Sequence, residues 1–92
     1  MPFDFDLSNE LKEKIQILSK KDRNRLKILK KKMDKIINSD EITIQNYKNL
    51  RNNLSDKKRV HIDKSFVLTF SYFKENNFIL FVDFDHHDKI YN

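Results

Sequence analysis

The chain has no glycine among its 92 residues, and this absence restricts the folds open to it more than any other feature. Glycine provides the tight turns and the close backbone approach that phosphate-binding loops need, so P-loop NTPases and dinucleotide-binding folds are excluded. Cysteine is also absent, which rules out a disulfide framework, a zinc–thiolate site and a cysteine nucleophile. Turns are left to Asn, Asp and Ser, and histidines and cations remain as the available catalytic groups.

The length and the hydropathy of the chain predict one small domain that spans residues 1–92. The longest apolar run, Phe78–Val82, is far short of the roughly 20 residues that a membrane-spanning helix needs. It is also too short for the core of a signal peptide. We therefore expect a cytoplasmic protein with no membrane partner.

Basic residues outnumber acidic residues by 19 to 14, and they are clustered. Nine lie between Lys20 and Lys35 and six between Lys48 and Lys64, each group against two acidic residues. Clustered Lys and Arg are typical of a nucleic-acid-binding surface, because they neutralise phosphates. A solvated, lysine-rich helix face would give the same pattern, so the charge alone leaves both interpretations open.

The N-terminal half predicts a strand followed by two helices. The segment Phe3–Leu7 alternates between apolar and acidic residues, which is the period of a half-buried strand. Ser8 can cap a helix that ends near Ser19, and Asp22 can cap a longer one that ends near Asn38. Apolar residues recur at helical spacing in both. They are Leu11, Ile15 and Leu18, then Leu26, Leu29, Met33, Ile36 and Ile37.

The C-terminal half predicts a loop and three strands. Ser39–Asp56 is polar and is expected to be a loop that can include a short helical turn. The runs Lys57–Asp63, Phe66–Phe73 and Phe78–Phe84 indicate strands. Lys74–Asn77 would join the last two, since Asn accepts the positive φ that a hairpin needs. The predicted class is α+β in the order β-α-α-β-β-β, with the N-terminal strand and an αα-hairpin packed on a mostly antiparallel four-stranded sheet.

All three histidines, His61, His86 and His87, lie in the last third of the chain. Imidazole titrates near neutral pH, so two histidines beside a cationic cluster could cleave a phosphodiester by general acid–base catalysis. Nearby cations would stabilise the negative charge of the transition state. Those cations are Arg59, Lys57, Lys58 and Lys64. The alternative is that the histidines are polar residues at the ends of the sheet.

The residues around 83–88 are also of the types that bind metal ions. Asp83, Asp85, His86, His87 and Asp88 would suit Mn²⁺ or Zn²⁺. Consecutive residues of a strand point to opposite faces, however, so His86 and His87 are not expected to bind one ion together. No helical spacing of histidines is present either. Neither a metal nor another cofactor is predicted.

The segment from Tyr47 to Tyr91 resembles the C-terminal half of the RelE/ParE superfamily of type II toxin–antitoxin toxins. The stretches that carry the resemblance read RVHID-SFVL-F and HHDKIY, and they look closest to the YafQ-like and archaeal RelE-like branches. The N-terminal strand and helices match the superfamily in their order. The resemblance implies an endoribonuclease that enters the ribosomal A site and cuts mRNA there, with the RNA 2′-OH as nucleophile and without a metal.

Carried over position by position, the resemblance implies that His61 and His87 are catalytic and that Tyr91 is the terminal aromatic of the site. Arg59 could supply a catalytic cation. Residues expected to bind RNA or the ribosome are Lys57, Lys58, Lys64, Lys27, Lys30, Lys31 and Lys89. The resemblance further implies an acidic or amphipathic, RelB-like antitoxin that covers the basic surface, and contact with operator DNA only through that antitoxin.

The sequence departs from the superfamily pattern at three places. Ser65 stands where YafQ-like toxins have a functional Asp, Val67 stands where RelE has a catalytic Arg, and Ser39–Asp56 lacks a further histidine of YafQ-like toxins. Arg59 or a neighbouring lysine could replace the missing cation, and Asp63 could orient His61. Two other functions are compatible with the chain: a ParE-like toxin that inhibits DNA gyrase, and a non-catalytic basic module that binds nucleic acid or acts as a co-repressor.

Overall fold

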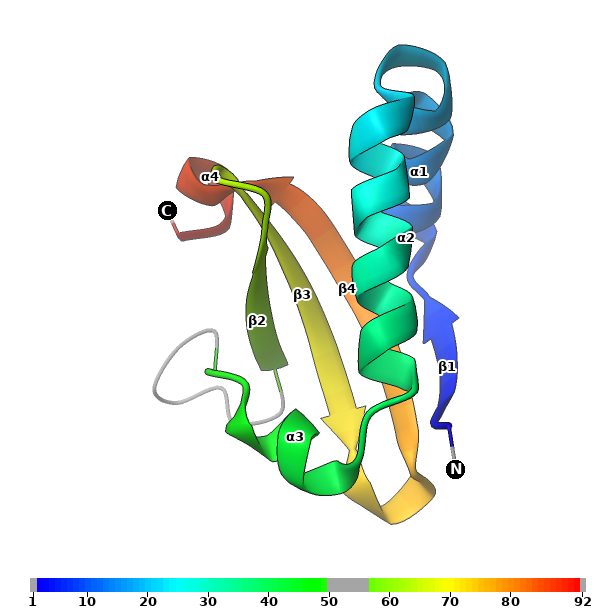
Figure 1. Cartoon of the computed structure of the whole chain (residues 1–92), viewed down its shortest axis with the longest axis vertical. Helices are drawn as coiled ribbons and strands as arrows, with labels where there is room; N and C mark the ends of the chain where they lie inside the picture. Colours follow the sequence, from blue (N-terminus) through cyan, green and yellow to red (C-terminus); the bar gives the residue numbers. More distant parts are fainter. Residues whose placement is uncertain (1, 50–56, 92) are drawn as a thin grey trace.

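The computed structural model describes residues 2–49 and 57–91, and it consists of one mixed sheet with helices (Figure 1). Most of the helical residues lie in the first half of the chain, and three of the four strands lie in the second half. The elements in chain order are β1 (Asp4–Leu7), α1 (Asn9–Lys21), α2 (Arg23–Ile37), α3 (Glu41–Asn46), β2 (Lys57–Ile62), β3 (Phe66–Phe73), the 3₁₀ turn η1 (Lys74–Asn76), β4 (Phe78–His86) and α4 (His87–Tyr91).

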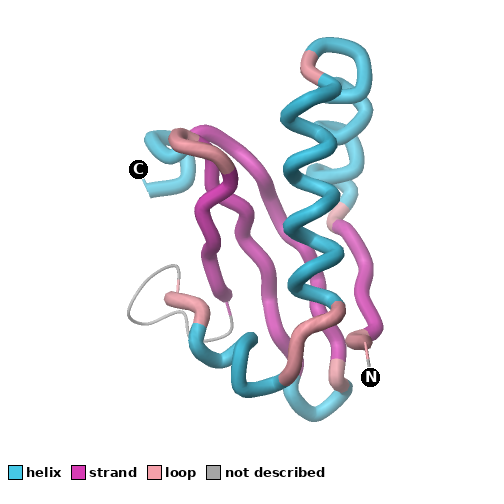
Figure 2. Tube along the Cα trace, in the orientation of Figure 1, coloured by secondary structure: helices cyan, strands magenta, loops and turns pink. Residues whose placement is uncertain are grey.

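The four strands lie in the order β1-β4-β3-β2, with β2 at one edge (Figure 2). The pairs β2–β3 and β3–β4 are antiparallel, whereas β1 pairs with β4 in parallel. A parallel pair needs a long connection between its strands, and the chain from α1 to β3 provides it. The predicted α+β class, with a mostly antiparallel four-stranded sheet, is confirmed.

The first two helices begin at the predicted caps. The Leu11 N–H donates to Ser8 Oγ at 3.1 Å, and the Arg25 N–H donates to Asp22 Oδ1 at 3.0 Å. These bonds satisfy backbone donors that the first turn of a helix leaves unpaired. Ser8 also donates its hydroxyl to the Val82 carbonyl at 2.5 Å, so the cap ties α1 to the sheet. The first helix runs to Lys21, slightly beyond the predicted end near Ser19.

The core lies between the αα-hairpin and one face of the sheet, where α1 and α2 run side by side (Figure 1). Leu11, Leu29 and Ile36 from the helices are fully buried with Phe70 and Phe81 from the sheet. Each was expected to be apolar core from its spacing or its strand. This packing leaves the opposite face of the sheet to the more polar residues of the strands.

The turns and connections differ in part from what the sequence predicts. Ser39–Asp56 contains α3, whose Ile44 is fully buried, so this turn helps to close the core; residues 50–56 of that segment lie outside the described part. β4 continues to His86, and the tail after it is helical, which the sequence analysis did not predict. Positive φ angles within the described ranges occur at Asp63 (58°) and Asn77 (51°), as expected for turns made without glycine.

None of the helices described in the structure is both long enough and apolar enough to cross a membrane.

Candidate functional site

The two histidines predicted to be catalytic lie against each other. The ring centroids of His61 and His87 are 5.8 Å apart, and the ring planes are inclined by only 26°. Both residues are exposed, and the His87 side chain retains 49% of its accessible surface. The structure therefore presents two neighbouring imidazoles to solvent, although they come from different elements and from well-separated parts of the chain.

The strand register explains why these histidines meet. His61 lies opposite Val67 on β3, and Val67 lies opposite Asp85 on β4, so the end of β4 is one strand away from the end of β2. The turn after β2 then closes the gap, because the Ser65 carbonyl accepts a hydrogen bond of 2.7 Å from the His87 N–H. Opposite residues of a sheet point to the same face, so Val67 lies beside His61, and it is fully buried there.

The third histidine is in a different environment. The His86 ring packs edge-on against Phe66, at 5.6 Å between centroids and an angle of 74°. Its Nδ1 accepts a hydrogen bond of 3.3 Å from the Asp88 N–H. His86 and His87 thus diverge, as predicted for consecutive residues at the end of a strand. Asp88 also lies near the pair, with its Oδ1 3.7 Å from His87 Nδ1.

Two of the predicted cations on β2 make bonds to the segment that precedes the strand. The Arg59 Nε donates to the Asn49 carbonyl at 3.3 Å, and the Lys58 Nζ donates to Asn49 Oδ1 at 3.0 Å and to the Gln45 carbonyl at 3.4 Å. Alternation along β2 puts Arg59 on the same face as His61. Lys57 is half-buried at the start of the strand.

The remaining predicted residues lie around the turn and α4. Lys64 is exposed in the β2–β3 turn, and Lys89 lines a small depression beside Phe66. Tyr91 is the last residue of α4. Asp63, which could orient His61 on the evidence of the sequence, makes other contacts: its carboxylate accepts from the Lys64 N–H at 2.8 Å and lies 3.8 Å from Arg25 Nη2.

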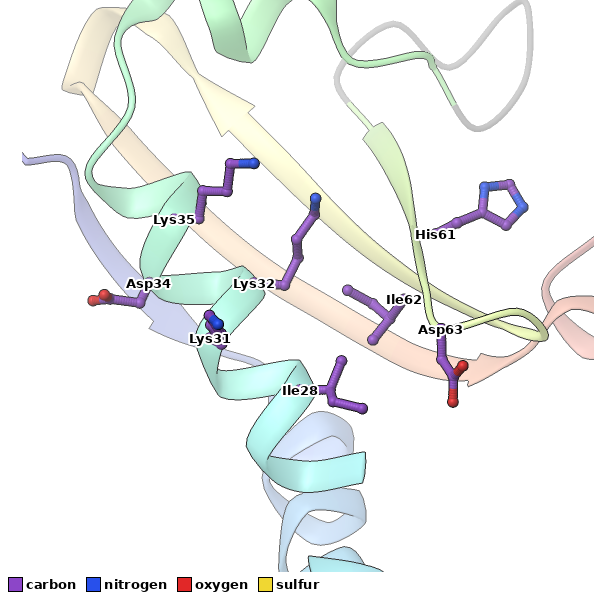
Figure 3. Close-up of a pocket in the computed structure, with 8 residues that line it drawn as sticks. All are labelled: Ile28, Lys31, Lys32, Asp34, Lys35, His61, Ile62 and Asp63. Atoms are coloured by element: carbon purple, nitrogen blue, oxygen red, sulfur yellow. The ribbon is translucent and has the colours of Figure 1, made fainter. Parts of the chain in front are cut away.

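The predicted RNA-binding lysines of α2 fall on two sides of that helix. Lys31 lines a groove of about 540 Å³ between α2 and β2, together with Lys32 and Lys35, which the sequence analysis did not single out (Figure 3). The His61 imidazole points away from α2 at the far side of the strand (Figure 3). Lys27 and Lys30 line a second depression on the other side of α2.

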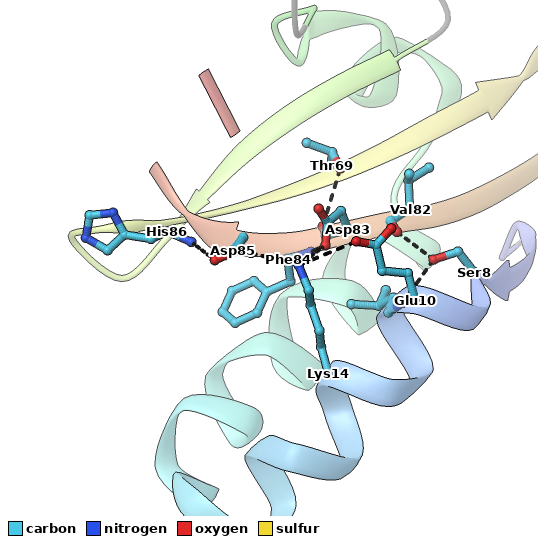
Figure 4. Close-up of polar contacts among 10 residues, drawn as sticks. Ser8, Glu10, Lys14, Thr69, Val82, Asp83, Phe84, Asp85 and His86 are labelled. Carbon is cyan, nitrogen blue, oxygen red and sulfur yellow. Dashed lines mark hydrogen bonds and ion pairs between the residues drawn. The ribbon is translucent and has the colours of Figure 1, made fainter. Parts of the chain in front are cut away.

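A further polar cluster joins α1 to β4 and had no signal in the sequence. The Lys14 Nζ donates to Asp83 Oδ1 at 2.6 Å and to Asp85 Oδ2 at 2.8 Å (Figure 4). Burial acts to lower the pKa of Lys14, but the hydrogen bonds and charges of both carboxylates together raise it above its ordinary value. Burial likewise acts to raise the pKa of Asp85, and the bond from Lys14 outweighs it, so that pKa is lowered.

The described ranges contain no group of three His, Asp or Glu side chains arranged to hold a metal ion. The Asp and His residues at 83–88, whose types suit metal ions, make separate contacts instead. Asp83 and Asp85 bind Lys14, and His86 packs on Phe66.

Comparisons with known proteins agree with the resemblance seen in the sequence. No protein-family model matches the chain. A protein of Methanocaldococcus jannaschii named "Putative toxin RelE4" is 47% identical over 89 residues, which cover 97% of this chain and 90% of that protein. This identity, over nearly the full length of both chains, places the two proteins in one family.

Two solved structures have the same fold. The toxin–antitoxin complex RelBE of Escherichia coli has a chain with a TM-score of 0.68 and 14% identity, covering 91% of this chain and 95% of that one. YafQ of Escherichia coli has a TM-score of 0.65 and 14% identity, covering 98% and 99%. Together with the archaeal relative, the order of elements and the HHDKIY tail lead to one conclusion: the chain belongs to the RelE family of toxins.

Proposed function

We propose that this toxin is a ribosome-dependent endoribonuclease that cleaves mRNA in the A site by metal-independent acid–base chemistry. The observation that carries the proposal is the exposed pair of His61 and His87 rings, 5.8 Å apart and nearly parallel. Two imidazoles in this arrangement can serve one phosphodiester, one on each side of the phosphorus.

The reaction needs two proton transfers. One imidazole, in its neutral form, takes the proton of the RNA 2′-OH while that oxygen attacks the phosphorus. The other, in its protonated form, gives a proton to the 5′-oxygen that leaves, and a 2′,3′-cyclic phosphate and a 5′-hydroxyl result. Imidazole is suited to both roles at neutral pH. His61 and His87 fill these two roles, in an order that solvent isotope and pH-rate measurements can assign.

Arg59 and Tyr91 complete the proposed site. The Arg59 guanidinium lies on the same face as His61, and guanidinium donors can stabilise the charge on the phosphoryl oxygens in the transition state. In this proposal, the Arg59 guanidinium takes the place of the catalytic arginine that RelE has at the position of Val67. Tyr91, at the end of α4, would supply the terminal aromatic of the family.

The basic surfaces would bind the RNA and the ribosome. Lys31, Lys32 and Lys35 point from α2 toward the groove beside β2, and in the described part of the chain none of their ammonium groups pairs with a carboxylate. Unpaired cations in a row are available to phosphates. The other cations that we propose to bind the RNA or the ribosome lie outside this groove lining; they are Lys27, Lys30, Lys57, Lys58, Lys64 and Lys89.

We also infer an antitoxin partner. RelBE of Escherichia coli is a toxin–antitoxin complex, and one of its chains has the fold described above. A net charge of +5 on this chain favours an acidic or amphipathic, RelB-like partner that covers the cations and the histidine pair. Operator DNA would then be contacted through the antitoxin, and the protein would act in the cytoplasm.

A cleavage assay with purified protein, mRNA and ribosomes tests the proposal. The wild type is expected to cut mRNA on ribosomes and not free mRNA. His61→Ala and His87→Ala are each expected to reduce the cleavage rate by about 10²–10⁴-fold, which is the usual contribution of one general acid or base.

His86→Phe is the matched control. It removes an imidazole next to His87 but keeps a ring against Phe66, so the rate is expected to stay within about threefold of wild type. Full activity in both alanine variants would disprove the assigned site. Intact mRNA combined with induction of the DNA-damage response would instead identify gyrase as the target, and binding without cleavage would identify a non-catalytic module.

A further inference from the structure

Arg25 lies on α2, across the sheet from the histidine pair, and it contacts three parts of the molecule at once. Its Nη1 donates to Asp22 Oδ2 at 2.9 Å, and its Nη2 lies 3.8 Å from Asp63 Oδ2. Its guanidinium carbon lies 4.1 Å from the centroid of the Phe66 ring. The side chain is 30% exposed, and its Nε is buried without a partner in the described part of the structure.

The shape of the guanidinium group suits these contacts. A planar cation can lie over an aromatic face and still donate, within its plane, to carboxylates at its edge. A lysine ammonium could form the ion pairs but could not stack in this way. Leaving Nε without a partner is unfavourable, so the contacts of the other atoms of Arg25 must outweigh that loss.

Two of the three contacts fall at the ends of the β2–β3 turn. Asp63 begins the turn with a φ of 58°, in the left-handed region that is unfavourable for residues other than glycine. Phe66 begins β3, and its ring is stacked on Phe84 at 5.2 Å. Arg25 therefore holds the turn from both sides and anchors it to α2.

This turn is connected to both histidines of the proposed site, although neither lies within it. His61 lies two residues before Asp63 on β2. The Ser65 carbonyl, inside the turn, accepts the hydrogen bond that fixes the His87 N–H at the start of α4. A shift of the turn would therefore move His61 and His87 relative to each other.

We propose that Arg25 is a positioning residue: by clamping Asp63 and Phe66 it sets the relative position of the His61 and His87 rings. The effect of Arg25 on the positions of the His61 and His87 rings is independent of the biochemical function of the protein. The effect on catalysis rests on the proposed nuclease function, and the two are therefore measured separately.

The first measurement is the contact between the two imidazoles in the full chain. Nuclear Overhauser effects between the ring protons of His61 and His87 are recorded for the wild type and for Arg25→Met, which keeps an aliphatic stem and removes the guanidinium. We expect the effect to be strong in the wild type and at least about twofold weaker in the variant, with changed ring-proton shifts.

Met33→Ala is the matched control, since Met33 is a buried core residue of the same helix. It is expected to destabilise the fold and leave the contact between the rings unchanged. Arg25→Lys keeps the charge without the stacking, and it is expected to weaken the ring contact to an intermediate degree. The lysine variant decides the question if Arg25→Met does not fold.

The second measurement is ribosome-dependent cleavage at a temperature where all variants are folded. Displacement of a catalytic group by about 1 Å can reduce a rate by about 10²-fold, so Arg25→Met is expected to lower kcat by about 10- to 100-fold with KM within about twofold. Met33→Ala should keep kcat within about twofold. An unchanged ring contact in the folded Arg25 variants would overturn the positioning role. Absence of cleavage by the wild type would refute the nuclease proposal and leave the ring measurement to decide the role of Arg25.

Discussion

Replacing Lys14 by methionine would isolate the cluster that joins α1 to β4. The ammonium group bonds Asp83 at 2.6 Å and Asp85 at 2.8 Å, and the three side chains are only 27%, 23% and 24% exposed. Methionine keeps most of the aliphatic stem, so the substitution removes the charge with little loss of packing. It also leaves two carboxylates, two residues apart on β4, without the cation between them.

The magnitude follows from these contacts. A hydrogen bond to a charged group contributes about 1.5–3 kcal/mol, and removing one partner of a buried ion pair costs about 3–5 kcal/mol. The residual exposure lets water recover part of this loss. We therefore expect Lys14→Met to lower the free energy of unfolding at pH 7 by about 2–3 kcal/mol. For a domain of this size that corresponds to a decrease in Tm of roughly 10–20 °C.

The pH dependence of the difference is a second part of this prediction. The pKa of Asp85 is lowered in the folded state, so its contribution is present above the unfolded pKa, near 3.9, and is lost as the pH falls through the folded pKa. The pKa of Lys14 is raised, so its contribution is present below about 10.4 and is lost as the pH rises through the folded value. The stability difference between wild type and variant should be largest between about pH 5 and 9.

Urea unfolding at a series of pH values, followed by circular dichroism, measures this difference. Lys12→Met is the control, because the Lys12–Asp6 pair is 3.9 Å long and its side chains are 55% and 62% exposed. Its effect should not exceed about 0.5 kcal/mol. The reasoning is refuted if Lys14→Met costs as little as this control at pH 7, or if its cost is the same at pH 3.

Two other predictions follow from single features of the structure. Changing both Lys31 and Lys35 to glutamine is expected to weaken RNA binding. The slope of log K against log salt concentration should fall by about 0.7 for each phosphate that is no longer neutralised. The control is Lys74→Gln, which should leave the slope unchanged, because the Lys74 ammonium group pairs with Glu41 at 3.4 Å. An equal slope in the wild type, the double variant and the Lys74→Gln control would show that the groove between α2 and β2 does not bind RNA. Asn77→Ala should lower the free energy of unfolding by about 1–2 kcal/mol in chemical denaturation, because Asn77 has a φ of 51°. Asn77→Gly should change that free energy by close to nothing. Equal losses in the two variants would mean that the side chain of Asn77, and not its backbone angle, matters.

Much of the fold could be predicted because its signals are local. The alternation of Phe3–Leu7, the helical spacing of the apolar residues and the caps Ser8 and Asp22 depend on residues a few positions apart. The same is true of Asn77, which makes the hairpin turn without glycine. The α4 helix was missed because five residues at the end of a chain carry too little periodicity to separate a helix from an extended tail.

The sequence also determined the family. The HHDKIY tail and the basic strand before it resemble RelE-like toxins, and the identity with the archaeal relative confirms that assignment. Composition also excluded classes of chemistry, since a chain without cysteine has no cysteine nucleophile and no zinc–thiolate site. Family membership and the excluded classes of chemistry depend on which residues are present and in what order, so they can be predicted from the sequence without a structure.

Only the tertiary structure decided which of these residues meet. The three histidines are alike in sequence, but the strand register and the Ser65–His87 hydrogen bond stack His87 on His61 and direct His86 to Phe66. The contacts of Lys14 with β4 and of Arg25 with the β2–β3 turn join residues distant in the chain. Such contacts depend on how elements pack across the sheet, and no spacing along the chain encodes that directly.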